Sequence, residues 1–264
     1  MSETFIKTDE FLDFFQKNKD RVWIFLDTET LGFNAKKHQM TEVAAKSVEF
    51  ENGHHKEVSC YHEKAKLLSA TRLRLATPFR GKGMSYRDIM KMTNYGEPIK
   101  NREYIEEKKM LSEILEFVDS FENPIIVAHN SSFDIGYLNK RYNIYFDNKN
   151  PFDDYEVLDT LKVMKRYFAP LVVTEAKRFN HRWLPPGEKK QINDMRKLRK
   201  ILMKKKTKKI SLRLGNVAEA LGLEIKGWHT AKFDVETLIS TTEEMLKLFN
   251  SSRGKKLYPE KYFI

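Results

Sequence analysis

The feature that most restricts the fold is an uninterrupted apolar run from Val22 to Leu26, which stops on Asp27. The run is too short for a buried helix, and its aromatic and β-branched side chains favour a strand. A strand that is apolar on both sides must be covered on both faces, as the central strands of α/β proteins are. The run therefore predicts a central strand with a carboxylate at its end.

The rest of the pattern predicts further strands early in the chain and alternating strands and helices later. We expect a short helix at 8–19, a hairpin of strands at 43–50 and 56–61 around a turn at 52–53, and a strand at 125–127. Apolar spacing predicts helices at 105–121, 134–142, 158–167, 212–221 and 233–249. The expected fold class is α/β, a mixed sheet flanked by helices, with residues 1–264 in a single domain.

The sequence favours neither a membrane protein nor a protein of an oxidising compartment. The single cysteine, Cys60, cannot form an internal disulfide or supply a thiolate metal site alone. No stretch approaches the roughly 18 apolar residues that a membrane span needs, and the first residues alternate charged and aromatic side chains. The sequence predicts a cytoplasmic protein without membrane contact.

The formal charge of +11 is concentrated in one block. Residues 174–213 hold 15 Lys and Arg against 3 Asp and Glu, which leaves the rest of the chain near neutrality. After an expected turn at 184–187, the block predicts a helix at 191–206 with an apolar stripe formed by Ile192, Met195, Leu198, Ile201 and Leu202. A smaller basic stretch covers 64–87. Clustered cations favour a polyanion partner, although solvated basic loops without a ligand remain an alternative.

Three segments bring acidic side chains to positions typical of a metal site. Asp27 and Glu29 are separated by one residue, so an extended strand would project both to the same side. Asp134 lies where a helix should begin after the strand at 125–127. His229 precedes the last expected helix and Asp234 falls about one turn into it. Taken singly, a surface turn, a helix-start acid stabilised by the macrodipole and a structural histidine would explain them.

In this order, the segments resemble the DEDDh branch of the DEDD exonuclease superfamily, the DnaQ-like family with an RNase H-like fold. Asp-Thr-Glu-Thr-Leu-Gly at 27–32 is similar to the first motif, and His-Asn-Ser-Ser-Phe-Asp at 129–134 to the second. His-x-Ala-x-x-Asp at 229–234 is similar to the third, and Leu-Asp-Thr-Leu at 158–161 to a segment between them. The long interval before the third motif makes 174–213 an expected basic insertion.

The resemblance implies a 3′ to 5′ exonuclease that releases nucleoside 5′-monophosphates with two Mg²⁺ or Mn²⁺ ions. Asp27, Glu29 and Asp234 would hold one ion with the scissile phosphate, and Asp27 would bridge to the second. Asp134 would complete the set through water. His229 would act as the general base, a task that suits an imidazole with a pKa near neutrality.

Further residues are predicted to contact the substrate. By analogy with the family, Thr30 and Leu31 would meet the terminal nucleotide. Phe133 could stack on a base or belong to the core, and His129 and Asn130 could bind the terminal sugar or order their turn. Within the basic block, Lys204, Lys205 and Lys206 are expected to track the strand backbone.

Other functions remain open at this point. The stretch at 212–223 resembles the first helix and turn of a helix-turn-helix, which would make the chain a DNA-binding regulator. A catalytically inactive nucleic-acid scaffold is a second alternative. The expected substrate is single-stranded DNA. The alternative is an RNA-directed 3′ exoribonuclease of the same family. The sequence does not indicate a protein partner.

Overall fold

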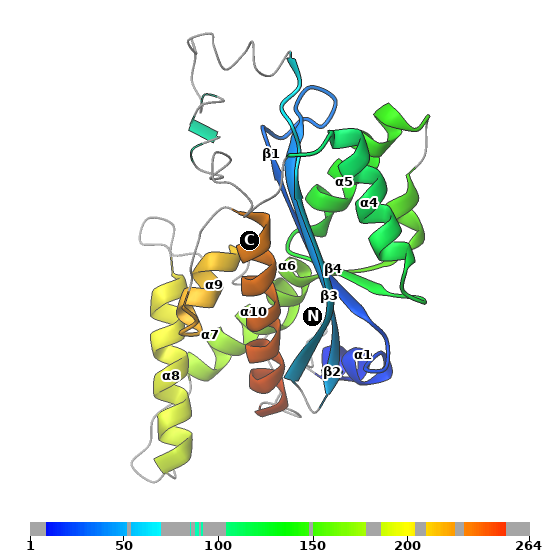
Figure 1. Cartoon of the computed structure of the whole chain (residues 1–264). Coiled ribbons are helices and arrows are strands. Elements are labelled where there is room, and N and C mark those ends of the chain that lie inside the picture. Colours follow the sequence, from blue (N-terminus) through cyan, green and yellow to red (C-terminus); the bar gives the residue numbers. More distant parts are fainter. Residues whose placement is uncertain are drawn as a thin grey trace, which may run out of the picture.

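A five-stranded mixed sheet in the order β3-β2-β1-β4-β5 forms the centre of the molecule (Figure 1). The computed structural model describes residues 9–51, 54–69, 85, 88–89, 91, 104–147, 150–177, 186–203, 210–224 and 230–251. The strands are β1 (Trp23–Thr30), β2 (Met40–Glu51), β3 (His54–Lys64), β4 (Ile125–Ala128) and β5 (Glu156–Asp159). β1 is antiparallel to β2 and parallel to β4, while β2 and β3 pair antiparallel and β4 and β5 pair parallel.

β1 is the central strand that the apolar run predicted, and its side chains feed two separate cores. Trp23 and Phe25 enter one core, whereas Ile24 and Leu26 enter the other, and all four are fully buried. This division follows from the alternation of side chains along a strand. The strand continues beyond Leu26 as far as Thr30, so Asp27 lies within it and not at its end.

Helices cover both faces of the sheet (Figure 1). The face that receives Ile24 is covered by α4 (Glu107–Asp119) and α5 (Ser131–Tyr145), followed by the 3₁₀ turn η1 (Pro151–Asp154). The face that receives Trp23 is covered mainly by α10 (Ala231–Ser251), with α1 (Asp9–Lys17) against its far end. None of the helices in the described ranges is long and apolar enough to cross a lipid bilayer.

The helix expected at 158–167 begins later and continues further. Residues 158 and 159 belong to β5, where Leu158 pairs with Val127. Asp159 then caps the helix by accepting hydrogen bonds from the backbone N–H groups of Leu161 and Lys162. A short edge strand that leads directly into a helix carries too few residues for its period to be distinguished from that of the helix.

This helix contains a π-helical turn. It comprises α6 (Thr160–Val163), the π segment η2 (Met164–Phe168) and α7 (Ala169–Lys177). Pro170 has no N–H and its ring would clash with the carbonyl of Arg166 in a regular α-helix. The wider turn directly before the proline relieves that clash without ending the helix.

The basic block contains a long helix packed away from the sheet. α8 (Pro186–Leu202) lies against α7 and α9 (Leu214–Ala220), with Ile192 and Met195 buried. Pro186 and Gly187 are its first residues and not part of a turn, since a proline is well tolerated at the start of a helix. Ile201, predicted to belong to the apolar stripe, is exposed. Residues 204–209, including Lys204, Lys205 and Lys206, lie outside the described ranges.

A buried ion pair joins the two helices on the α5 side of the sheet. Arg141 of α5 donates from Nε and Nη2 to the two carboxylate oxygens of Glu107 on α4, at 2.7 and 2.5 Å. Glu107 also accepts from the backbone N–H of Met40 and from the Tyr145 hydroxyl. Arg141 further donates to the carbonyl of Ala35, in the loop that follows β1. The pair therefore fixes that loop as well as the helices.

Replacement of Arg141 by Met should lower the free energy of unfolding by about 3 kcal/mol or more, because it leaves the Glu107 carboxylate buried without its cation. Arg166→Met is the control, since Arg166 pairs with Glu10 at the surface, where ion pairs contribute under about 1 kcal/mol. Chemical denaturation of both variants measures the difference. Equal losses would contradict this account of the buried pair.

Candidate active site

β1 carries two carboxylates onto the face covered by α10. Asp27 and Glu29 continue the alternation of Trp23 and Phe25, so they point toward the same side of the sheet. The pairing with β2 shifts register directly after Glu29. At this irregularity the Thr41 hydroxyl of β2 donates to the carbonyl of Glu29, which holds the bulged backbone in place.

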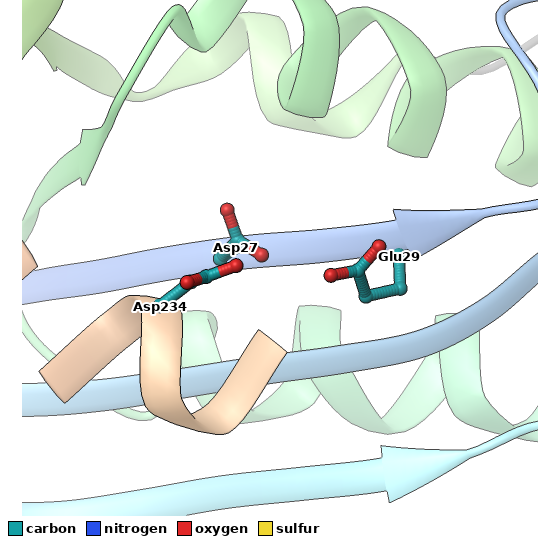
Figure 2. Close-up of side chains that lie close together, drawn as sticks. All are labelled: Asp27, Glu29 and Asp234. Atoms are coloured by element: carbon teal, nitrogen blue, oxygen red, sulfur yellow. The ribbon is translucent and has the colours of Figure 1, made fainter. Parts of the chain in front are cut away.

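The first turn of α10 supplies a third carboxylate, Asp234. Figure 2 shows its side chain beside those of Asp27 and Glu29, in the space between β1 and the helix. One carboxylate oxygen from each of the three residues lies within 4.8 Å of the others. Residues that are as much as 207 positions apart in the sequence thus form one group of oxygen ligands suited to a hard divalent cation.

Asp134 reaches the same region from the opposite face of the sheet. It lies in the first turn of α5, and its Oδ1 accepts from the Thr28 hydroxyl at 2.7 Å and from the Thr28 backbone N–H at 3.1 Å. Thr28 lies between Asp27 and Glu29 on β1 and points to the other side. Asp134 is therefore held next to the three-carboxylate group without belonging to it.

The four carboxyl groups favour their protonated forms in the absence of a cation. Burial, followed by repulsion from Asp134, Asp234 and Glu29, raises the pKa of Asp27 well above its usual value. Burial and the charge of Asp234 raise the pKa of Glu29 to about 8. Burial also raises the pKa of Asp134 and of Asp234 to about 7. A site of this kind gains stability from bound positive charge.

A further carboxylate, Glu42, is 1% exposed, stands beside this group and was not predicted. It lies on β2 directly opposite Glu29 and contributes to the raised pKa of Asp27, Glu29 and Asp234. Its own oxygens face β3, with His62 Nε2 at 2.8 Å and Lys64 Nζ at 3.7 Å. The sequence gives only a weak signal for it, an acid immediately before the apolar strand residues that begin at Val43.

An exposed aromatic ring, also not predicted, follows the first motif. Phe33 is 94% exposed, and its ring centroid lies 6.2 Å from that of Phe133, which in turn lies 5.5 Å from that of Tyr137. The exposure of Phe33 is unusual for a large apolar side chain. In the sequence, the signal for this residue was its position directly after Gly32, the last residue of the first motif.

The loop that carries Phe33 is firmly anchored. The N–H of Leu31 donates to the carbonyl of Gln39, and the Tyr137 hydroxyl donates to the carbonyl of His38. Gly32 has φ +152°, and a Cβ there would lie 2.3 Å from the His38 ring. Two residues in this region were predicted to contact the terminal nucleotide. The Leu31 side chain is buried, and the Thr30 hydroxyl donates to the carbonyl of Gly32.

The turn between β4 and α5 holds two further predicted residues. Asn130 is exposed and adopts a left-handed backbone conformation, and its N–H donates to Asp159 Oδ1 at 3.1 Å. His129 Nδ1 lies 3.1 Å from the Thr160 hydroxyl, and burial lowers the pKa of this histidine. The segment at 158–161 thus orders the second motif. His229, the predicted base, lies outside the residues that the structure describes.

Part of this chain matches a known protein family. A family model described as DNA polymerase family B, exonuclease domain, matches residues 26–166. This range contains Asp27, Glu29 and Asp134, whereas Asp234 lies beyond it. A search of curated proteins gave no match.

Solved structures of exonuclease I have a similar fold. One superposes with a TM-score of 0.55 at 16% identity, over 88% of this chain and 43% of that chain. Exonuclease I of E. coli with a dA16 oligonucleotide gives 0.54 at 15%, over 88% and 43%. The zinc-bound E. coli complex with single-stranded DNA gives 0.53 at 16%, over 86% and 41%. The chain spans less than half the length of these proteins, and the likeness confirms the expected mixed-sheet fold.

The raised pKa values predict that the protein without metal loses stability as pH rises. Glu29, Asp134 and Asp234 bind protons more tightly in the folded chain than in the unfolded chain, so their contribution is greatest below pH 4 and is lost as pH passes 7 to 8. With a chelator present, the melting temperature should fall by about 4 °C or more between pH 6 and pH 8. Mg²⁺ should remove most of this fall.

Asp234→Asn provides the control for that measurement, because it removes one of the mutually repelling charges at nearly constant volume. Its melting temperature without metal should hold or rise relative to the unsubstituted chain at pH 8. A drop of several degrees would show that the carboxylates stabilise the fold without a cation.

Proposed function

The chain belongs to the exonuclease-domain family of DNA polymerase family B, and on that premise we propose that it removes nucleotides from the 3′ end of single-stranded DNA. The products would be nucleoside 5′-monophosphates, and the proposed cofactors are two Mg²⁺ or Mn²⁺ ions. The observation that carries the proposal is the group formed by Asp27, Glu29 and Asp234, whose oxygens lie within 4.8 Å of one another.

The side chains of this group fit divalent cations in type and in charge. They offer only carboxylate oxygens, the donors that Mg²⁺ and Mn²⁺ prefer. Their mutual repulsion is the expected property of a site that binds positive charge. We assign Asp27, Glu29 and Asp234 to one ion and Asp27 to a second. When bound, such ions supply positive charge that stabilises the phosphate and the departing 3′ oxygen.

The chain's own residues have distinct tasks in this proposal. His229 accepts a proton from the water that attacks phosphorus, a role supported by its place in the third motif, five residues before Asp234 in the sequence. Asp134, whose carboxylate accepts two hydrogen bonds from Thr28, adds a fourth negative charge beside the group and orients water next to it. Thr28 therefore sets the position of Asp134 relative to Asp27.

The single strand is proposed to meet aromatic and basic surfaces. Phe33, which follows the first motif, and Phe133, which directly precedes Asp134, have neighbouring rings on which unpaired bases would stack. Asn130, exposed at the β4–α5 turn, would bind the terminal sugar, with His129 ordering the turn. Thr30 and Leu31 would supply backbone contacts to the terminal nucleotide.

Single-stranded DNA is favoured over RNA because the exonuclease I structures with a similar fold include complexes with a dA16 oligonucleotide and with single-stranded DNA. RNA cleavage remains the second candidate. A helix-turn-helix regulator is disfavoured, because residues 26–166 match an exonuclease domain and because Asp27, Glu29 and Asp234 form a group that DNA binding alone does not need.

Substitution of the site residues should abolish cleavage without unfolding the chain. Asp27→Asn, Glu29→Gln, Asp134→Asn and Asp234→Asn should each lose most activity on a 5′-labelled single strand with Mg²⁺. His229→Ala should slow single-turnover cleavage by about 10² to 10⁴-fold while strand binding persists, since it acts on water. Products are resolved at single-nucleotide resolution.

Glu63→Gln is the control, because Glu63 lies on β3, projects to the face of the sheet opposite to Asp27 and Glu29, and is not assigned a role. It should retain activity within a few-fold. The proposed function fails if two or more of the carboxylate variants cleave at nearly the unsubstituted rate. Faster cleavage of RNA than of DNA would select the second candidate.

The basic block is proposed to hold the strand upstream of the cleaved end. Replacing Lys204, Lys205, Lys206, Lys208 and Lys209 by Ala should weaken binding of a 30-mer. It should also reduce the slope of log affinity against log salt by roughly 0.7 for each phosphate group that the variant no longer binds. Cleavage of a dinucleotide should be unchanged, since it is too short to reach the block.

A triple substitution of Lys108, Lys109 and Lys140 is the control, because these exposed residues lie on α4 and α5, on the other face of the sheet. It should leave kcat/KM for both substrates nearly unchanged. Equal losses on the dinucleotide and the 30-mer in the five-lysine variant would mean that the block supports the active site and does not hold the strand.

A further inference from the structure

A row of three charged residues crosses the sheet beside the carboxylate group. Glu29 on β1 pairs with Glu42 on β2, and Glu42 pairs with Lys64 on β3. Residues that pair in this way project to the same face of the sheet, so the row lies on the α10 side. Two carboxylates therefore stand next to each other, with a lysine beyond the second.

Glu42 and Lys64 form a deeply buried pair. The Glu42 side chain is 2% exposed and the Lys64 side chain 5% exposed, and Lys64 Nζ lies 3.7 Å from Glu42 Oε2. The other oxygen, Oε1, lies 2.8 Å from His62 Nε2. Both oxygens of Glu42 are thus occupied on the side of β3, the side away from Glu29.

Charge balance gives this arrangement a consequence for the neighbouring site. Asp27, Glu29, Asp134 and Asp234 together carry four negative charges when ionised, which two divalent cations would neutralise. Glu42 adds a fifth negative charge, strong enough at its distance to raise the pKa of Asp27, Glu29 and Asp234. Lys64 acts in the opposite sense on Glu29, whose pKa it lowers.

We propose that Lys64 sets the divalent-cation affinity of the site by neutralising Glu42 and by holding its carboxylate toward β3, away from Asp27, Glu29 and Asp234. Lys64 and Glu42 are positioning residues and do not contact the substrate. The inference rests on the proposed function in that it requires the carboxylate group to bind divalent cations. A lysine used only for packing would affect stability and leave cation affinity unchanged.

The test is a double-mutant cycle in which cation binding is measured directly. Mn²⁺ is titrated into the chain and the free ion is followed by electron paramagnetic resonance, with Mg²⁺ measured by calorimetry. Lys64→Met should tighten Mn²⁺ binding by about tenfold, because Glu42 then adds an unbalanced negative charge. Glu42→Gln should weaken binding several-fold, because the Lys64 charge is then unbalanced. The double variant should return to within about twofold of the unsubstituted chain.

Two further variants separate charge from packing. Lys64→Arg keeps the positive charge and should bind Mn²⁺ nearly as the unsubstituted chain does. Lys109→Met breaks an exposed pair with Glu113 on α4 and should not alter Mn²⁺ affinity. If Lys64→Met does not fold, Glu42→Gln is compared with the double variant. The inference then requires Glu42→Gln to bind Mn²⁺ several-fold more weakly than the double variant does.

The outcomes distinguish this inference from the proposed function. An unsubstituted chain that binds neither Mn²⁺ nor Mg²⁺ would overturn the proposed function. Binding in the unsubstituted chain together with affinities within twofold in Lys64→Met and Glu42→Gln would overturn the inference alone. Opposite changes in the two single variants that cancel in the double variant support it.

Discussion

The alternation of side chains along one strand buried on both faces is the constraint on which the structure depends. β1 gives Trp23 and Phe25 to one core and Ile24 and Leu26 to the other, so helices must cover both sides of the sheet. The same alternation then sends the Asp27 carboxylate toward α10 and Thr28 toward α5. The same alternation therefore decides which apolar side chains enter each core and which carboxylates face α10. A shift of β1 by one residue would send each of its side chains to the opposite face of the sheet.

Concentrating buried negative charge at one place is costly, and the surrounding structure holds it in two ways. Hydrogen bonds fix the position of carboxylates that repel one another, as Thr28 does for Asp134. Cations from the next strands offset part of the charge, as Lys64 does for Glu42. The Glu107–Arg141 pair holds the loop after β1 in a similar manner, with both of its charges satisfied. Rigid surroundings of this kind keep the carboxylates close together, as the proposed cation site requires.

Much of this molecule was predictable from sequence because its strongest signals are local. The apolar run before Asp27 predicted the central strand, and the ordered motifs predicted the exonuclease family, which the match over 26–166 confirms. Leu158 and Asp159 were wrongly assigned to a helix, and β5 was not predicted, because its four residues carry no distinct period. The pairing of Glu42 with Lys64 could not be predicted, because it depends on the register of β2 and β3, which shifts between Ser47 and Val48. The role of His229 stays a prediction.

The distance in sequence between β1 and α10 has a consequence for the protein during its synthesis. Asp27 leaves the ribosome long before Asp234, which follows 207 residues later, and the three-carboxylate group closes only when α10 packs on the sheet. A growing chain that has folded β1 to β5 possesses the first two motifs but lacks the ligand from the third. Under the proposed function, a chain synthesised only as far as β5 would lack one carboxylate of the cation site, and cleavage would begin only after α10 has packed on the sheet.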